Sequence, residues 1–362
     1  MRRALELAAR AVGQTSPNPP VGAVLVKRGR IVGEGYHHRA GSAHAEIEAL
    51  RQAGPAAQEA TLYTTLEPCN HTGRTPPCCD AILRVGIAHV VVAIVDPNPR
   101  TNGRGIARLR REGVRVTTGV LRQPAQALIA PFEKVMRTGL PWVIAKIGQS
   151  LDGKIATVTG ESQWITSPAA RIVGHRLRSQ ADAILIGVTT ILRDDPRLTV
   201  RGARQRVGRP MKVIVDSRLQ TPPAAACLSP RSPAPTLIAT TVGNRLRQAR
   251  LRRQGADIVV LPARRGRVPL RRLCRGLARR GIHSVLIEGG GELQAVAFEE
   301  RLVDRIVWCL APRIIGGRTA PSSVGGQGIR RLRDSIRLAD VQARWIGPDL
   351  CVDAAVVYPG RL

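Results

Sequence analysis

The stretches HAE (residues 44–46) and PCNHTGRTPPC (residues 68–78) determine how the first part of this 362-residue chain is interpreted. One imidazole and two thiols supply three ligands for Zn²⁺, and three protein ligands leave the fourth tetrahedral position for water, as in a catalytic zinc site. Zinc lowers the pKa of its bound water to roughly 7, and a nearby carboxylate can carry the released proton. We therefore predict a zinc site at His44, Cys69 and Cys78, with Glu46 as the proton carrier.

The pattern around these motifs predicts an α/β protein with two domains. Two apolar runs on either side of residues 28–30 predict a hairpin, and helical and strand patterns then alternate up to residue 138. Such alternation indicates a mostly parallel sheet covered by helices. Thr138-Gly139-Leu140-Pro141 must end a helix, and an apolar strand begins at Trp142. We place the boundary there, which gives domains 1–140 and 141–362.

The second domain also alternates between the two patterns. We expect helices at residues 168–179, 244–254, 269–280 and 290–300. The expected strands are 142–147, 182–187, 211–215, 235–239, 257–261, 283–288, 303–310 and 350–357. The second domain is therefore predicted to be α/β as well.

Composition limits the classes of function. Aromatic residues make up 2% of the chain, which argues against base-stacking surfaces for single-stranded nucleic acid. The net charge is +30, but 51 of the 56 basic residues are arginine and the charge is spread along both halves, so it does not mark a binding patch. We expect no nucleic-acid partner, although the charge would attract anionic small substrates.

Targeting signals and cysteine usage point to a cytoplasmic protein. No apolar stretch approaches the ~20 residues of a membrane helix, and Glu6 and Arg10 interrupt the apolar residues of the N-terminal segment. We therefore expect no membrane contact and no secretory signal. Three of the seven cysteines lie within residues 69–79, which favours metal binding or catalysis over disulfides. Cys79, next to a predicted ligand, is interpreted as structural.

The spacing of the zinc motif resembles one branch of known deaminases. The cytidine and deoxycytidylate deaminase superfamily pairs H-x-E with P-C-x-x-C, whereas eight residues separate the two cysteines here. The inserted block resembles that of the bifunctional deaminase/reductase family of riboflavin biosynthesis, as do TSPNPPVG (15–22), GEGYH (33–37) and DPNP (96–99). The resemblance implies a cytidine-deaminase-like α/β/α sandwich and the same zinc and proton-transfer roles. It also implies substrate contacts by Asn18, His37, His71 and Arg74.

A glycine-rich turn marks a candidate cofactor site in the second half. EGGGEL (288–293) ends an apolar strand and opens a helix, where free backbone amides can bind phosphate. An ordinary strand-to-helix turn is the alternative. The segments KIGQSLDGKIA (146–156), GESQWIT (160–166), DDPRLTVR (194–201) and IEGG (287–290) resemble the reductase half of the same family.

The reductase resemblance implies a dihydrofolate-reductase-like α/β fold that uses NADPH. The implied NADPH residues are Gly148, Trp164, Thr190, Asp194, Ser217, Gly290, Gly291, Glu292, Leu293, Gln294, Ala295 and Val296. The implied substrate contacts are Ser162, Arg178, Leu198, Arg201 and Glu288, and arginine suits a sugar phosphate because it can bind it bidentately. Lys146 and Glu288 are implied catalytic residues that manage the proton as hydride arrives. A structural ion pair is the alternative for Lys146.

The resemblance to this family implies a bifunctional enzyme that acts on phosphoribosyl pyrimidines. The first domain would replace the 2-amino group of 2,5-diamino-6-ribosylamino-4(3H)-pyrimidinone 5′-phosphate by oxygen. The second would reduce 5-amino-6-(5-phosphoribosylamino)uracil to the ribityl compound. The resemblance also implies a homo-oligomer, either a dimer or a tetramer.

Two other interpretations do not account for the sequence. A tRNA-type base deaminase explains neither the eight-residue spacing nor the second half of the chain. A basic nucleic-acid-binding module with a structural zinc requires four protein ligands, whereas the motif supplies three.

Overall fold

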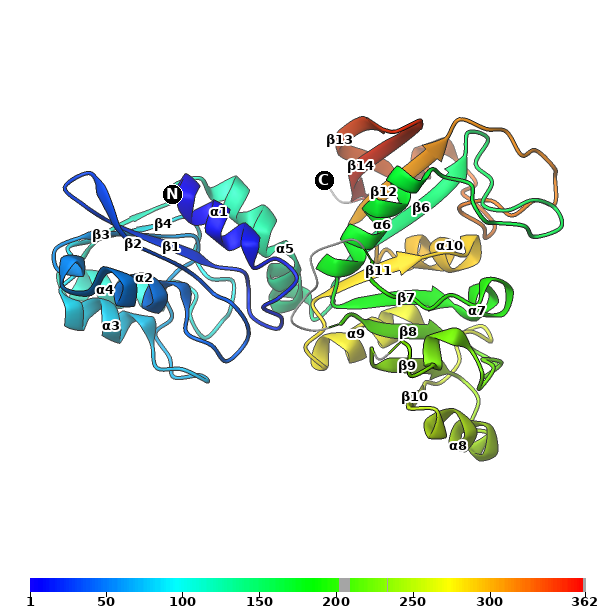
Figure 1. The fold of residues 1–362 in the computed structure, drawn as a ribbon, viewed down its shortest axis with the longest axis horizontal. Helices are drawn as coiled ribbons and strands as arrows, with labels where there is room; N and C mark the ends of the chain where they lie inside the picture. Colours follow the sequence, from blue (N-terminus) through cyan, green and yellow to red (C-terminus); the bar gives the residue numbers. More distant parts are fainter. Residues whose placement is uncertain (202–208, 233, 361–362) are drawn as a thin grey trace. The chain divides into compact units, whose positions relative to one another are not determined.

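The computed structural model describes residues 1–201, 209–232 and 234–360. The chain divides into two compact units, Met1–Gly139 and Leu140–Leu362. Each unit contains a sheet with helices packed against it (Figure 1), which confirms the predicted α/β class. Among the described residues, no helix is both long enough and apolar enough to span a membrane.

The first unit has a five-stranded sheet in the order β2-β1-β3-β4-β5. Strand β1 is antiparallel to both β2 and β3, and β3, β4 and β5 are parallel. Helices α1 and α5 lie on one face of this sheet, and α2, α3 and α4 lie on the other (Figure 1). The strands are Gly22–Lys27, Arg30–Tyr36, Thr61–Thr64, His89–Val92 and Arg115–Thr118, and the helices are Arg2–Arg10, Ala45–Ala53, Cys78–Val85, Arg104–Arg111 and Arg122–Thr138, with a 3₁₀ turn at Gly54–Ala57.

Two glycines in β2 bring helix α2, and with it His44, close to the sheet. A Cβ at Gly33 would lie 2.3 Å from the carbonyl oxygen of Ala49, and one at Gly35 would lie 2.4 Å from that of Ala45. No side chain fits in either place, so the helix backbone rests directly on the strand. His44 is the residue immediately before this helix, and its position therefore depends on that contact.

The second unit has a nine-stranded sheet in the order β10-β9-β8-β7-β11-β6-β12-β14-β13. Its strands are parallel from β10 to β12, and β14 pairs antiparallel with both β12 and β13. Strands β6 to β14 are Trp142–Ser150, Ala183–Gly187, Met211–Val215, Thr236–Thr240, Ala256–Val260, Ser284–Glu288, Arg305–Ala311, Arg337–Ile346 and Asp349–Val357. Helices α6 to α10 are Pro168–Gln180, Val188–Asp194, Arg245–Arg253, Leu270–Arg279 and Gly291–Glu299, with 3₁₀ turns at Ala226–Leu228 and Leu332–Asp334.

Helices cover both faces of this sheet because its central strands are apolar on both sides. In β11, Val285 and Ile287 pack in the core formed with α9 and α10, whereas Leu286 packs with Leu177 of α6. Alternate residues of a strand point to opposite faces. A strand that is apolar at every position is therefore buried on both faces, as expected of a parallel sheet.

The structure differs from the sequence predictions at three places in the second unit. Helix α7 and strand β13 were not predicted; β13 is an edge strand whose residues are almost all exposed, so it lacks a buried face. The preference for metal binding or catalysis over disulfides, which rests on the three clustered cysteines, does not extend to one other pair. Cys309 and Cys351 are buried, stand directly opposite each other on β12 and β14, and form a disulfide.

Candidate functional site

The three predicted zinc ligands meet at the starts of two helices. His44 precedes α2, Cys78 is the first residue of α3, and Cys69 lies in the loop between β3 and α3. His44 Nδ1 lies 3.2 Å from the sulfur of Cys78 and 3.6 Å from that of Cys69. All three donor atoms lie within 4.8 Å of one another.

This donor set fits a zinc ion. Zinc bonds of about 2.0–2.3 Å place two tetrahedral ligands about 3.6 Å apart, close to the observed separations. Hydrogen bonds with Cys78 and His44 lower the pKa of Cys69 to about 4, so this sulfur is a thiolate, the form that binds metal. Thr75 Oγ1 lies 3.3 Å from His44 Nε2, and such a partner on the second ring nitrogen orients a ligating histidine.

Glu46 lies beside this cluster on the first turn of α2. Its side chain is 3% exposed, and burial raises the pKa of its carboxyl group to about 7. It also interacts with the Cys78 side chain. A carboxyl group with a pKa close to neutral can both take up and release a proton, as a proton carrier must.

The predicted pyrimidine contacts of the first unit divide into two groups. His37 donates from Nδ1 to the carbonyl oxygen of Ala43 at 3.0 Å, so its Nε2 accepts from the amide of Asn18 at 3.0 Å. The His37 ring lies edge-on to that of His44, with centroids 5.4 Å apart, and Asn18 and His37 therefore lie beside the predicted zinc ligands. Burial lowers the pKa of His37, which favours the neutral ring.

The other two predicted contacts lie in the loop between the cysteines. His71 Nδ1 is 3.4 Å from Thr101 Oγ1, which ties that loop to the one before α4. Arg74 is exposed.

Glu67 was not identified from the sequence; its carboxylate binds the backbone of the segment between β4 and α4 and of the start of α4. Its carboxylate is 3% exposed. Oε2 accepts the backbone N–H groups of Asp96 and Gly103 at 3.0 and 2.8 Å, and Oε1 accepts those of Gly105 and Ile106 at 2.9 and 3.2 Å. Three of these donors lie at the start of α4, where backbone amides are free to bind an anion. The position of Glu67 beside the Pro-Cys motif was the available signal.

The second candidate site is a cavity of about 1190 Å³ in the second unit. It opens beside the carboxyl ends of β7, β8 and β11 and beside the carboxyl-terminal half of β6. Parallel α/β sheets bind ligands at this edge. Every predicted NADPH residue except Ala295 lines it, and so do Lys146 and all five predicted substrate contacts. Ala295 is buried within α10.

The cavity fits a dinucleotide at the start of α10. Gly289 and Gly290 have φ values of 78° and 59°, which favour glycine, and they deliver the chain to the helix with its first amides free. Gln294, one turn into α10, is 1% exposed and lines the cavity. Neither of its amide atoms has a hydrogen-bond partner among the described residues. A buried amide without partners is costly, and a polar ligand such as NADPH would satisfy it.

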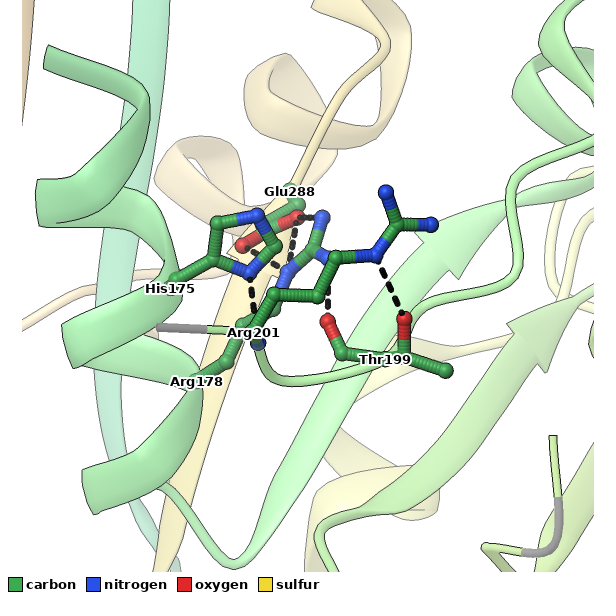
Figure 2. A network of polar contacts seen from close by, with 5 residues as sticks. All are labelled: His175, Arg178, Thr199, Arg201 and Glu288. Atoms are coloured by element: carbon green, nitrogen blue, oxygen red, sulfur yellow. Dashed lines mark hydrogen bonds and ion pairs between the residues drawn. The ribbon is translucent and has the colours of Figure 1, made fainter. Parts of the chain in front are cut away.

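Lys146 and Glu288 stand side by side on the adjacent parallel strands β6 and β11. Glu288 is bound directly by Arg178 rather than by Lys146: Arg178 Nε donates to the carboxylate at 2.9 and 3.0 Å, and the terminal nitrogens reach Glu288 and the Thr199 carbonyl oxygen (Figure 2). Burial would raise the pKa of Glu288, but Arg178 outweighs it and holds the pKa below its ordinary value. Most donors of Arg178 are thus engaged, which limits its predicted contact with substrate phosphate.

The Lys146 side chain lies against two glycines. A Cβ at Gly174 of α6 would lie 3.4 Å from Lys146 Cε, and one at Gly148 would lie 3.8 Å from Nζ. Burial lowers the pKa of Lys146. Its ammonium group therefore gives up a proton more readily than an exposed lysine does.

Polar contacts at the rim of the cavity connect the remaining predicted residues. Ser162 donates to Asp194 at 2.9 Å. Trp164 is 61% exposed, and the guanidinium of Arg171 lies 4.4 Å from its ring centroid. Arg201 Nε lies 3.3 Å from Thr199 Oγ1.

Comparisons with known proteins agree with both sites. Residues 141–352 match the RibD C-terminal domain, and residues 1–94 match the zinc-binding region of cytidine and deoxycytidylate deaminases. The riboflavin biosynthesis protein RibD of Aquifex aeolicus (strain VF5) is 42% identical over 97% of this chain and 96% of its own length. The chain belongs to the RibD family.

Solved structures of the RibD family have the same fold over both units. A structure of Acinetobacter baumannii RibD is 34% identical, has a TM-score of 0.89 and covers 98% of this chain and 97% of its own. A Thermotoga maritima structure, described as a diaminohydroxyphosphoribosylaminopyrimidine deaminase/5-amino-6-(5-phosphoribosylamino)uracil reductase, is 31% identical, has a TM-score of 0.85 and covers 99% and 97%. As a RibD-family protein, this chain is a zinc-dependent deaminase and an NADPH-dependent reductase of riboflavin biosynthesis, which confirms the predicted function over its alternatives.

Proposed function

We propose that the first unit deaminates 2,5-diamino-6-ribosylamino-4(3H)-pyrimidinone 5′-phosphate, with His44, Cys69 and Cys78 holding zinc and Glu46 carrying the proton. The convergence of three metal donors beside a buried carboxyl group carries this proposal. Zinc, when bound, acts as a Lewis acid that lowers the pKa of a water molecule. The T. maritima relative, whose name gives the same pair of activities, supports the choice of substrate.

The deamination exchanges one bond at C2 of the pyrimidine. Glu46 accepts a proton from the attacking water as the C2–O bond forms and delivers it to the ring nitrogen whose double bond to C2 opens. It then transfers the remaining hydroxyl proton to the amine as the C2–N bond breaks, ammonia leaves and C2=O forms. Water supplies the oxygen of the product and the hydrogen that converts the amino group into ammonia. His37 and Asn18 are coupled by a hydrogen bond and would orient the pyrimidine; His71 and Arg74 would contact it from the inserted loop.

In the second unit, we propose that Lys146 and Glu288 act on the opened ribose of 5-amino-6-(5-phosphoribosylamino)uracil. NADPH, when bound in the cavity, would supply the hydride for C1′. Lys146 donates a proton to the imine nitrogen, so that one hydride and one proton convert C1′=N into C1′H–NH. Glu288, held ionised by Arg178, stabilises the protonated lysine before this transfer. Ser162, Leu198 and Arg201 complete the substrate contacts, and the residues lining the cavity around α10 bind NADPH.

A zinc chelator tests the two-site assignment. The three ligands all lie in the first unit, so chelation should abolish ammonia release and leave NADPH oxidation on supplied intermediate unchanged. Lys146→Ala should have the opposite effect. Equal loss of both activities in a chelated protein that stays folded would refute the assignment.

We also propose that the chain forms a homo-oligomer in the cytoplasm, as the family resemblance implies. Sedimentation velocity at several concentrations measures the oligomer. Fractionation of the host cell measures the location.

A further inference from the structure

His175 lines the reductase cavity but has no role in the reduction as described so far. It lies on α6 one turn before Arg178, and its Nδ1 accepts the backbone N–H of Arg201 at 3.3 Å (Figure 2). A neutral imidazole that accepts at Nδ1 carries its proton on Nε2. Burial and the neighbouring Arg178 lower the pKa of His175, which favours this neutral form.

His175 is bonded to the backbone of Arg201 through Nδ1, and a backbone hydrogen bond also joins it to Thr199. Among the residues drawn in Figure 2, no contact is marked at Nε2, and the surroundings of the ring are positively charged. Lys146, Arg178 and Arg201 bring three cations to this end of the cavity, whereas Glu288 brings one carboxylate, which Arg178 already binds. The excess positive charge suits a phosphate monoester, which carries close to two negative charges near neutral pH. Arg178 has few donors left for that group, so Arg201 and the Nε2–H of His175 are the donors available to it.

We propose that His175 binds the phosphate group of the reductase substrate through its Nε2–H, beside the guanidinium of Arg201. This inference rests on the proposed reduction of a phosphoribosyl pyrimidine and adds a phosphate-binding residue to it. The same histidine fixes the backbone of Arg201 through Nδ1, so one ring both positions the arginine and contacts the anion.

Two substitutions separate these roles because each retains one nitrogen position of the ring. An asparagine amide lies where Nδ1 lies, so His175→Asn can still accept the Arg201 N–H but has no donor at the Nε2 position. A glutamine amide reaches the Nε2 position, so His175→Gln retains the distal donor and loses the inner acceptor. If His175 only anchors the Arg201 backbone, the asparagine variant is the active one; if it binds phosphate, the glutamine variant is.

The test measures NADPH oxidation with the phosphorylated intermediate and with its dephosphorylated form. A hydrogen bond to a charged group contributes enough for His175→Asn to raise KM for the phosphorylated substrate about 10- to 100-fold. His175→Gln should raise KM by a smaller factor, because it retains the distal donor and loses only the support of the Arg201 backbone. The value of kcat should change little in both variants, and the dephosphorylated substrate should not distinguish them. Inorganic phosphate should inhibit the wild type competitively and His175→Asn more weakly by a similar factor.

The proposal is overturned if His175→Asn leaves KM unchanged, if His175→Gln is as impaired as His175→Asn, or if both substrates lose affinity equally. Ammonia release and tryptophan fluorescence report whether each variant is folded. If the wild type itself fails to oxidise NADPH with supplied intermediate, the proposed function has failed rather than the assignment of His175.

Discussion

Glu67→Gln provides a sharp test of how the zinc site is supported, because it changes one atom of a side chain that is not a ligand. The Glu67 carboxylate accepts four backbone N–H groups, two on each oxygen. A glutamine amide keeps one accepting oxygen and presents an N–H₂ group in place of the other. In either orientation of the amide, two of the four backbone N–H groups face the glutamine N–H₂ group and lose their acceptor.

The cost of those two donors sets the expected magnitude. A buried polar group left without a partner costs about 1–3 kcal/mol, so the pair should lower the unfolding free energy of the first unit by roughly 2–6 kcal/mol. Domains are typically stable by about 5–15 kcal/mol, which makes this a large share. The site has little room to relax: a Cβ at Gly105 would lie 2.1 Å from the carbonyl oxygen of Pro68, so α4 already rests on the segment that leads to Cys69.

The chain carries a reporter that separates the two units. All four tryptophans (Trp142, Trp164, Trp308 and Trp345) lie in the second unit. In urea, tryptophan fluorescence therefore follows the second unit, whereas ammonia release and zinc retention follow the first. Glu67→Gln should move the midpoint of the first unit to lower urea and leave the fluorescence midpoint and NADPH oxidation unchanged.

Glu112→Gln is the matched control, because Glu112 is exposed at the end of the same helix. It makes the same chemical change and should alter neither midpoint. A Glu67→Gln variant that behaves like this control would refute the reasoning. A loss confined to the second unit would refute it as well.

Three further predictions follow from buried charges elsewhere in the chain. Glu46→Gln should reduce ammonia release by about 10²- to 10⁴-fold without loss of zinc, and metal analysis that finds zinc lost would instead make Glu46 a ligand. Arg178→Met should destabilise the second unit by about 3–5 kcal/mol, because it leaves the buried Glu288 carboxylate without its partner. Adding Glu288→Gln should restore part of the lost stability, measured by urea unfolding. If the double variant regains no stability, the pairing is contradicted. Burial lowers the pKa of Lys212 from 10.5 to about 8, so the unfolded chain binds more protons between these values and the stability of the second unit should rise with pH across that window. Lys212→Met should abolish this rise in the fluorescence-detected midpoint, and a rise equal to that of the wild type would assign it to another group.

Secondary structure was predictable where the order of apolar and polar residues within one segment indicated a single element type. The parallel strands of the second unit are apolar on both faces, and β11 is buried at all five positions, so their sequences stand out. Strand β13 is the opposite case. Its ten residues are exposed or nearly so, and only its pairing with β14 makes it a strand; pairing is a property of two segments, which a local pattern does not contain.

The same distinction explains which site residues the sequence could indicate. The predicted zinc donors fall within two short motifs of recognisable spacing, and the structure brings them together. The link between Arg178 and Glu288 joins residues 110 positions apart, so the sequence offered both residues but not their contact. Lys212 is a buried cation that no local sequence pattern indicates. It is 1% exposed, and its ammonium donates to the Cys227 and Ser232 carbonyl oxygens and to the Ser232 hydroxyl.

The eight residues between Cys69 and Cys78 have a structural consequence beyond lengthening the loop. Thr75, inside this insertion, contacts the ring nitrogen of His44 that does not face the sulfurs, and His71 contacts Thr101 across the site. A two-residue spacing has no room for either contact. The insertion therefore supplies a partner for the histidine predicted to bind zinc and a bridge to the loop that Glu67 holds. It links the predicted ligands to the segment that would contact substrate. In this RibD-family chain, the feature that set the motif apart from other deaminases also joins the metal donors to the rest of the site.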